Sequence, residues 1–293
     1  MIITRVIADL TQDLIRGKES SAGTDMQFDY RERASTAYKD LSETISNPAM
    51  WIMLGWLDLK RQYRRTFLGP VWLTVSTAIT LGAFALVWSQ IFDRPIKDYL
   101  PKVAIGYVIF SLVSQCMVDG SKSLIVSSSV MIETRIPKLS ILLRHFCGFV
   151  FMFLHHFLVT VVIVITLIPA DSIRAGEAAI AISLITLNGF FCQTSLAIVC
   201  MRFRDLPLVV TNIMQIMFLV SPVLWVSSDL SGQAAEVLRF NPIAVAIEMV
   251  RNPLIGNPSE IFHWFFAILF TCLNFLIATC IFIVLRHRIP YWV

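Results

Sequence analysis

The amino-acid sequence predicts an all-helical, multi-pass membrane protein with six transmembrane helices and an amphipathic interfacial helix ahead of them. Of its 293 residues, 56% are hydrophobic and only 15% are charged. The mean hydropathy of +0.71 is far above what a soluble domain of this length needs. The apolar residues also gather in segments of about 20 residues, the length of helix that crosses a hydrocarbon core.

Six apolar segments account for the predicted spans, and none of them contains Asp, Glu, Lys or Arg. They lie near residues 71–92, 103–118, 146–168, 178–201, 208–226 and 261–285. The second is short, and we allow it to extend past Asp119 toward Val126. Twelve Lys and Arg residues flank the spans on the side of the two termini and six lie on the other side, so the positive-inside rule predicts cytoplasmic termini.

The chain divides into three parts. Residues 1–47 are expected to form a cytoplasmic, partly disordered segment, because residues 17–46 are polar with few apolar anchors. Helical spacing over residues 2–16 favours a short amphipathic helix, with a frayed terminus as the open alternative, and the charges there argue against a signal peptide. Residues 48–66 form the predicted interfacial helix, which has a basic end, and residues 67–293 form the transmembrane domain.

Two connections between spans are predicted to contain helices that do not cross the membrane. On the cytoplasmic side, residues 132–143 have the composition of a short helix broken at Pro137. On the opposite side, residues 234–240 and 243–250 are moderately apolar and are separated by Asn241 and Pro242. This pattern indicates two half-length helices that enter the outer leaflet without crossing it.

Neither ATP hydrolysis nor ion-driven transport is indicated by the motifs of this chain. Gly17-Lys18-Glu19-Ser20 is similar to the end of a phosphate-binding loop, but Gln12 stands where the first glycine should be. An ion-coupled transporter needs an ionisable residue near the membrane midplane, and the candidates here are three histidines. We interpret them as structural or interfacial residues: His155, His156 and His263.

Enzymatic and metal chemistry are also not indicated. The acidic residues of the cytoplasmic side are scattered singly, and Asp205 is expected to form an ion pair with Arg204 rather than act as a base. The six cysteines lack metal-ligand spacing, so we interpret them as small apolar side chains. The net charge of +4 follows the loops, so nucleic acid is not an expected partner.

Aromatic residues are frequent in the first, second and fifth predicted spans. Aromatic rings stack on sugar rings, so a channel lined by them would let a glycan slide without tight binding at one point. Contact with lipid and with the membrane interface is the alternative interpretation. The candidate channel-lining residues are Phe84, Trp88, Tyr107, Phe110, Phe218 and Trp225.

Residues 58–72, DLKRQYRRTFLGPVW, resemble the start of the ABC-2 type permeases that export O-antigen, capsule and teichoic acid. Further similarities are Ile136-Pro137-Lys138, Arg202-Phe203-Arg204-Asp205, Ser221-Pro222 with Trp225, and Asn241-Pro242 with Glu248 and Arg251. The resemblance covers residues 48–285. The chain departs from the family pattern in its long segment before Pro48, and in having one proline where many relatives have two in the loop around Pro137.

The resemblance implies the type V exporter fold and a homodimer that docks on two separate ATPase subunits. ATP and Mg²⁺ would then be bound by those subunits, and no cofactor is expected in this chain. Residues 51–63 would form a gate helix, 132–143 a coupling helix and 234–250 outer gate helices. The residues implied at the arriving lipid pyrophosphate are Trp51, Trp56, Lys60, Arg61, Tyr63, Arg64 and Arg65. Those implied in coupling to the ATPase are Glu133, Arg135, Pro137, Lys138, Arg202, Arg204 and Asp205.

The function expected on this basis is that of a transport subunit in the inner membrane of a bacterium. Its substrate would be a polysaccharide, carried on an undecaprenyl lipid, that moves from the cytoplasm to the periplasm. Export of a small lipid or drug is the alternative within the same fold. A membrane glycosyltransferase and an ion-coupled transporter remain as alternatives from other classes.

Overall fold

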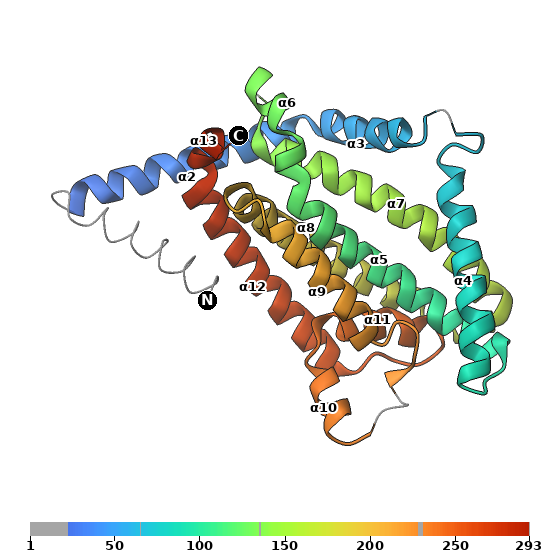
Figure 1. The fold of residues 1–293 in the computed structure, drawn as a ribbon. Coiled ribbons are helices and arrows are strands. Elements are labelled where there is room, and N and C mark those ends of the chain that lie inside the picture. Colours follow the sequence, from blue (N-terminus) through green and yellow to red (C-terminus); the bar gives the residue numbers. More distant parts are fainter. Residues whose placement is uncertain (1–22, 65, 135, 228–230, 293) are drawn as a thin grey trace.

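A computed structural model describes residues 23–64, 66–134, 136–227 and 231–292, and its elements there are helices joined by turns (Figure 1). The predicted amphipathic helix at residues 2–16 and the Gly17–Ser20 motif lie outside the described residues. Five described helices are long and apolar enough to cross a membrane. The chain is therefore a multi-pass membrane protein of the all-helical class.

The bundle contains five long helices, and α5 (Ile96–Val126) lies in its middle beside four others. These are α4 (Val71–Ile91), α7 (Lys138–Leu167), α8 (Ala175–Arg202) and α12 (Ile261–Leu285). Of the four, α4, α7 and α8 pack directly on α5, and α12 packs on α8. Apolar residues spaced three and four apart along α5 are fully buried, among them Ile105, Ile109 and Leu112 at 1% exposure each. The core of the bundle is thus built around this one helix.

The remaining helices lie at the two ends of the bundle (Figure 1). We name these ends after α3 and α11. At the α3 end lie α2 (Gly23–Ser46), α3 (Pro48–Gln62), α6 (Ser128–Glu133) and, after the turn η3 (Arg286–Arg288), α13 (Ile289–Trp292). At the α11 end lie α10 (Gln233–Arg239) and α11 (Pro242–Leu254), which agree with the two half-length helices predicted there.

The predicted spans match the helices unevenly. The first and sixth agree with α4 and α12, whereas α5 extends the second span at both ends and α8 slightly extends the fourth. The fifth is corrected: α9 (Leu206–Val220) ends before Pro222, because a residue that precedes proline is driven to the extended conformation that Ser221 adopts. Its 15 residues span about 22 Å, less than the thickness of a hydrocarbon core. The count of six spans therefore stays a prediction.

At the α3 end the structure differs from the expected arrangement at two places. The helix expected at residues 132–143 is not a separate element: α6 ends at Glu133, and α7 begins at Lys138 directly after Pro137 and continues through the third span. Within residues 1–47, the segment expected to be partly disordered, the structure describes a helix of 24 residues, α2, from Gly23 to Ser46. Ala37, Asp40 and Thr44 of this helix are buried, at a spacing that places them on one face. Packing of that face on α7 and α12 stabilises α2 in a way that its polar composition does not reveal.

Candidate functional site

Helix α3 lies across the α3 end of the bundle and packs closely on α7. The close approach depends on Gly55, since a Cβ atom at this position would lie 2.6 Å from the carbonyl oxygen of Arg144. Nearby, the ring of Trp56 meets the edge of Phe151 with ring centroids 5.5 Å apart. Trp51 points to the other neighbour and donates its indole N–H to the carbonyl of Thr44 in α2 at 3.1 Å. The predicted interfacial helix is thus held from two sides.

A two-fold hydrogen-bonded ion pair locks α3 to α7. Arg144 donates from Nε to Asp58 Oδ2 at 2.5 Å and from Nη2 to Asp58 Oδ1 at 2.7 Å. The Asp58 side chain keeps 32% exposure and that of Arg144 keeps 18%, so the pair is partly shielded from water. This contact was not predictable from local sequence, because Asp58 and Arg144 are 86 positions apart.

The basic end of α3 remains exposed. Lys60, Arg61 and Arg64 are exposed, and Arg65 lies outside the described residues. The half-buried Tyr63 has its phenol pKa raised by burial, so it stays a neutral hydrogen-bonding group at physiological pH. Exposed guanidinium and ammonium groups beside a neutral phenol can bind phosphate. Of the two tryptophans predicted for the same site, Trp51 contacts α2 and Trp56 contacts α7, and Trp56 lies one helical turn before Lys60.

Four of the six predicted channel aromatics form one cluster between α4, α5 and α9. Phe84 lies 5.9 Å from Tyr107 and 6.4 Å from Phe218, and Phe110 lies 5.2 Å from Phe218, measured between ring centroids. We call Phe84, Tyr107, Phe110 and Phe218 the aromatic cluster. The other two candidates are elsewhere: Trp88 stacks on Phe92 at 5.7 Å, and Trp225 follows α9 and donates to the carbonyl of Leu219.

Six of the seven residues expected to couple to an ATPase are described by the structure, and these lie at the α3 end in two groups. Pro137 and Lys138 start α7 near the buried pair formed by Asp40 and Arg286, whose Nε–Oδ2 distance is 2.5 Å. Thr44 adds a hydroxyl contact of 2.9 Å to Ser140 beside that pair. Glu133 is exposed at the end of α6, and Arg135 lies outside the described residues.

The second group surrounds the C-terminal helix α13. Arg204 donates to the carbonyl of Trp292 at 3.0 Å, and the guanidinium of Arg202 lies 5.9 Å from the centre of the Trp292 ring. The ion pair predicted between Arg204 and Asp205 is therefore wrong for the part of the chain described, because Arg204 turns to the backbone of α13 instead. Asp205 is exposed at the start of α9.

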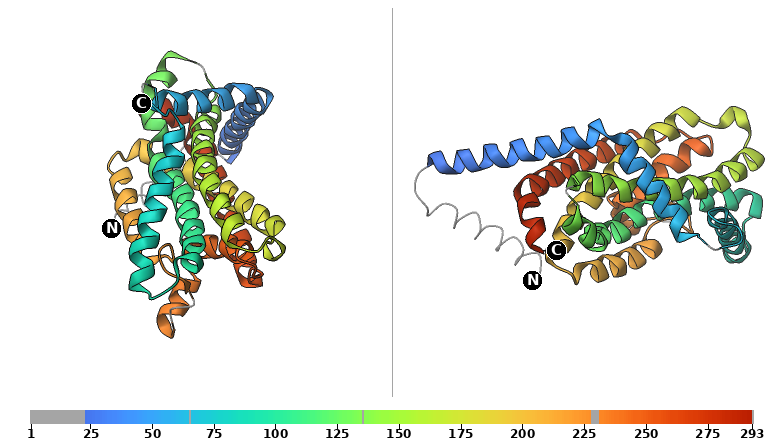
Figure 2. Two further views of the ribbon diagram at one scale, coloured as in Figure 1. Left: turned by 90° about the vertical axis from the view of Figure 1, so that its right-hand side faces the viewer. Right: turned by 90° about the horizontal axis from the view of Figure 1, so that it is seen from above.

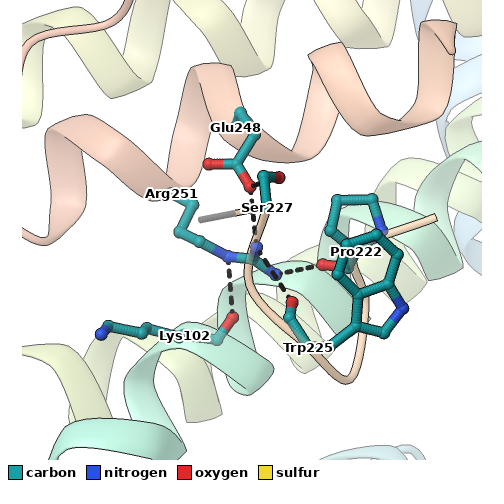
Figure 3. A network of polar contacts seen from close by, with 6 residues as sticks. All are labelled: Lys102, Pro222, Trp225, Ser227, Glu248 and Arg251. Carbon is teal, nitrogen blue, oxygen red and sulfur yellow. Dashed lines mark hydrogen bonds and ion pairs between the residues drawn. The ribbon is translucent and has the colours of Figure 1, made fainter. Parts of the chain in front are cut away.

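A buried arginine that sequence reasoning left without a role organises the α11 end (Figure 3). Arg251 is 0% exposed and its guanidinium reaches three segments of the chain. It donates to Glu248 at 2.9 Å, to the carbonyl of Lys102 at 3.1 Å and to the carbonyl of Pro222 at 2.5 Å. Ser227 completes the network with a bond of 2.7 Å to Glu248. The guanidinium group of Arg251 thus joins α11 to α5 and to the turn that follows α9.

Histidine, cysteine and acidic side chains do not gather into a metal site in the described ranges. The six cysteines are free thiols; Cys116 and Cys200 are buried, and Cys272 and Cys280 are exposed. His156 lies 3.4 Å from the Ser111 hydroxyl, and His263 is buried at the start of α12.

Long apolar helices, a helix α3 with an exposed basic end and a buried network of polar contacts at the opposite end define a helical, multi-pass membrane protein. The family model described as ABC-2 type transporter matches residues 50–255, which run from α3 to α11. This is more than half of the chain, and the protein belongs to the ABC-2 type transporter family. A comparison with proteins of curated function gives no match.

Membership defines the role of the chain at a coarse level. It is the membrane permease subunit of an ABC exporter, and it works with an ATP-binding subunit that supplies the energy. The chain is the transport component of that assembly rather than the catalytic ATPase.

Proposed function

We propose that this permease exports a polysaccharide, linked to an undecaprenyl lipid and of the O-antigen type, from the cytoplasm to the periplasm of a bacterium. Two copies of the chain would form the channel in the inner membrane, with both termini cytoplasmic, and two ATPase subunits would dock at the α3 end. ATP and Mg²⁺ would be held by the ATPase subunits.

The observation that carries the proposal is that the exposed basic end of α3 is followed directly in the chain by α4, a helix that contributes Phe84 to the aromatic cluster. Lys60, Arg61 and Arg64 are exposed where α3 gives way to α4, and Phe84 of α4 belongs to the cluster. Cations at the membrane surface suit the pyrophosphate of a lipid carrier, because guanidinium groups hold phosphate in two-point contacts. Aromatic faces further along suit the sugar rings that follow.

A second copy of the chain would complete the channel. Helices α4 and α9, which carry Phe84 and Phe218, flank the same side of the bundle (Figure 2). The outer faces of both helices are apolar and exposed, with Leu86 at 62% and Leu219 at 70%. A partner facing that side would enclose a channel with aromatic side chains from both chains.

Docking of the ATPase at the α3 end is supported by the exposed charges there. Three exposed charged residues lie near α6 and α13: Glu133 ends α6, Arg202 ends α8, and Arg204 lies in the turn between α8 and α9. Charged residues at the rim of an interface set the orientation of a partner. Because α2, α7 and α12 meet at the Asp40–Arg286 pair, a push at this surface would be transmitted to two long helices.

Deletion of the gene in its host, followed by gel analysis of surface glycans and fractionation of undecaprenyl-linked polymer, tests the proposal. We expect polymer to be lost from the surface and to accumulate inside the cell. Complementation with Phe218→Ala should restore export poorly, whereas Phe265→Ala, which removes a lipid-exposed ring from α12, should restore it fully. Normal surface glycan in the deletion strain would exclude a polysaccharide substrate and favour the alternative, a small lipid or drug.

A further inference from the structure

A cavity of about 450 Å³ separates α9 from α8 and α12 in the half of the bundle near the α11 end. Ile213, Met214 and Met217 of α9 form one wall. Leu184, Ile185 and Asn188 of α8, together with residues of α12, form the opposite wall, and residues of α5, α10 and α11 complete the lining. The cavity exists because α9 packs on α5 and makes few contacts with α8 or α12.

The lining of this cavity is almost entirely apolar, and its few polar side chains are already paired. Asn188 donates from Nδ2 to Thr271 Oγ1 at 3.1 Å, and the Cys192 thiol donates to Asn188 Oδ1 at 3.3 Å. The Asn241 side chain caps α11 by accepting from two backbone N–H groups and donates to the Ser221 hydroxyl. The cavity therefore suits a hydrocarbon ligand far better than a polar one.

The helices on either side of the cavity present hydrocarbon to their surroundings. On α12, Ile268 and Leu269 are exposed at 51% and 57%, and on α9, Ile213, which itself lines the cavity, is exposed at 46%. In a membrane-spanning bundle such faces contact lipid chains, so the cavity opens among alkyl chains and not into water. If a cavity of this size were empty, the atoms of its walls would lack van der Waals partners on one side. Water would not fill it stably, because an apolar lining offers no hydrogen-bond partners.

We propose that this cavity binds one alkyl chain of a membrane lipid. The site is separate from the aromatic cluster. Its volume lies in the range of pockets that hold small ligands. Two methionines of the wall, Met214 and Met217, can adapt to a flexible chain because their side chains are unbranched and polarizable. The bound chain would support α9 from behind and so hold Phe218, one turn from Met214, in the aromatic cluster. This inference depends on the membrane class of the protein and not on the identity of its substrate.

Photo-crosslinking in liposomes tests the proposal. The full chain is reconstituted with phosphatidylethanolamine and phosphatidylglycerol that include a phospholipid with a diazirine near the end of one acyl chain, and the modified residues are mapped by mass spectrometry. Ile185 is only 6% exposed and faces the cavity, so its labelling reports a chain inside, whereas labelling of Ile268 reports the surrounding bilayer. Two variants accompany the wild type: Ala267→Phe narrows the cavity, and Ala83→Phe adds the same ring to an exposed position of α4.

We expect Ile185 and Asn188 to be labelled in the wild type and in Ala83→Phe. In Ala267→Phe this labelling should fall about tenfold, the change that an affinity loss of about 1.4 kcal/mol produces, while labelling of Ile268 stays constant. Absence of label from the α8 wall in the wild type would overturn the proposal, as would label that persists in Ala267→Phe. Protein–protein crosslinks through α8 in place of lipid adducts would overturn it too, by showing that a second copy fills the cavity. If Ala267→Phe fails to fold, Ala246→Leu narrows the cavity from α11 and is judged by the same criteria.

Discussion

Replacement of Arg251 by Met should destabilise the protein more than any other single substitution at the α11 end. The change leaves the carboxylate of Glu248 and the carbonyl oxygens of Lys102 and Pro222 without their donor in a buried site. Removing one partner of a buried ion pair costs about 3–5 kcal/mol. With a change of about 2–4 °C for each kcal/mol in a protein of comparable size, the midpoint of thermal unfolding should fall by on the order of 10 °C.

The assay is thermal unfolding in detergent, followed by fluorescence-detected gel filtration, with a matched control from the same end of the molecule. Arg239 also pairs with a glutamate, Glu260 at 3.6 Å, but both side chains are more than half exposed, at 54% and 61%. Arg239→Met should therefore cost at most about 1 kcal/mol. The double variant Glu248→Gln with Arg251→Met should be more stable than Arg251→Met alone, because no uncompensated charge remains buried. Equal midpoints for Arg251→Met and Arg239→Met would refute the reasoning.

Three further substitutions test the α3 end by the same thermal assay. Gly55→Leu should lower the free energy of unfolding by about 1–3 kcal/mol, because the new Cβ meets the Arg144 carbonyl. The control Gly82→Leu on α4, where no heavy atom lies within 4 Å of the Cβ position, should leave it unchanged. Similar losses for the two variants would contradict the close packing of α3. Asp58→Asn should cost about 1–2 kcal/mol, since the pair with Arg144 is charge-assisted but partly solvated, and an unchanged midpoint would show that the pair contributes nothing. Asp40→Asn should lower the free energy of unfolding by about 3–5 kcal/mol, because this carboxylate is 0% exposed and is bound to the guanidinium of Arg286 in η3. The variant should also make α2 more sensitive to trypsin. Trypsin resistance equal to that of the wild type would show that the pair does not hold α2 in place.

The spans were predictable where apolar character and helix coincide. Segment 261–285 matches α12 because both of its ends are set by a change from charged to apolar residues. Segment 146–168 misses the start of α7, because Arg144 and Lys138 continue the helix beyond the apolar part, and hydropathy reports solvent preference rather than backbone conformation. The end of α9 at Pro222 was visible as a proline signal within an apolar run, yet hydropathy alone carried the predicted span through it.

The candidate site was predictable in composition and only partly in arrangement. The aromatic cluster joins three of the predicted spans, and four of the six residues proposed from their abundance do meet there. The contacts of Arg251 were not predictable, because one of them reaches across 149 positions to Lys102 and no local pattern encodes such a contact. A signal did exist: Glu248 and Arg251 stand three residues apart in an otherwise apolar helix, and a burial-compatible ion pair is the usual explanation of such charges.

The central claim is that this permease, driven by a separate ATPase, moves a lipid-linked polysaccharide across the membrane. The most direct test is reconstitution of the permease with its ATP-binding subunit in liposomes that hold undecaprenyl-linked polymer in the leaflet facing the nucleotide. We expect ATP to make the polymer accessible to a glycosidase confined to the other side, and Phe218→Ala to slow this transfer. Polymer that stays inaccessible, while a short-chain fluorescent lipid crosses in an ATP-dependent manner, would contradict the claim and identify a lipid exporter.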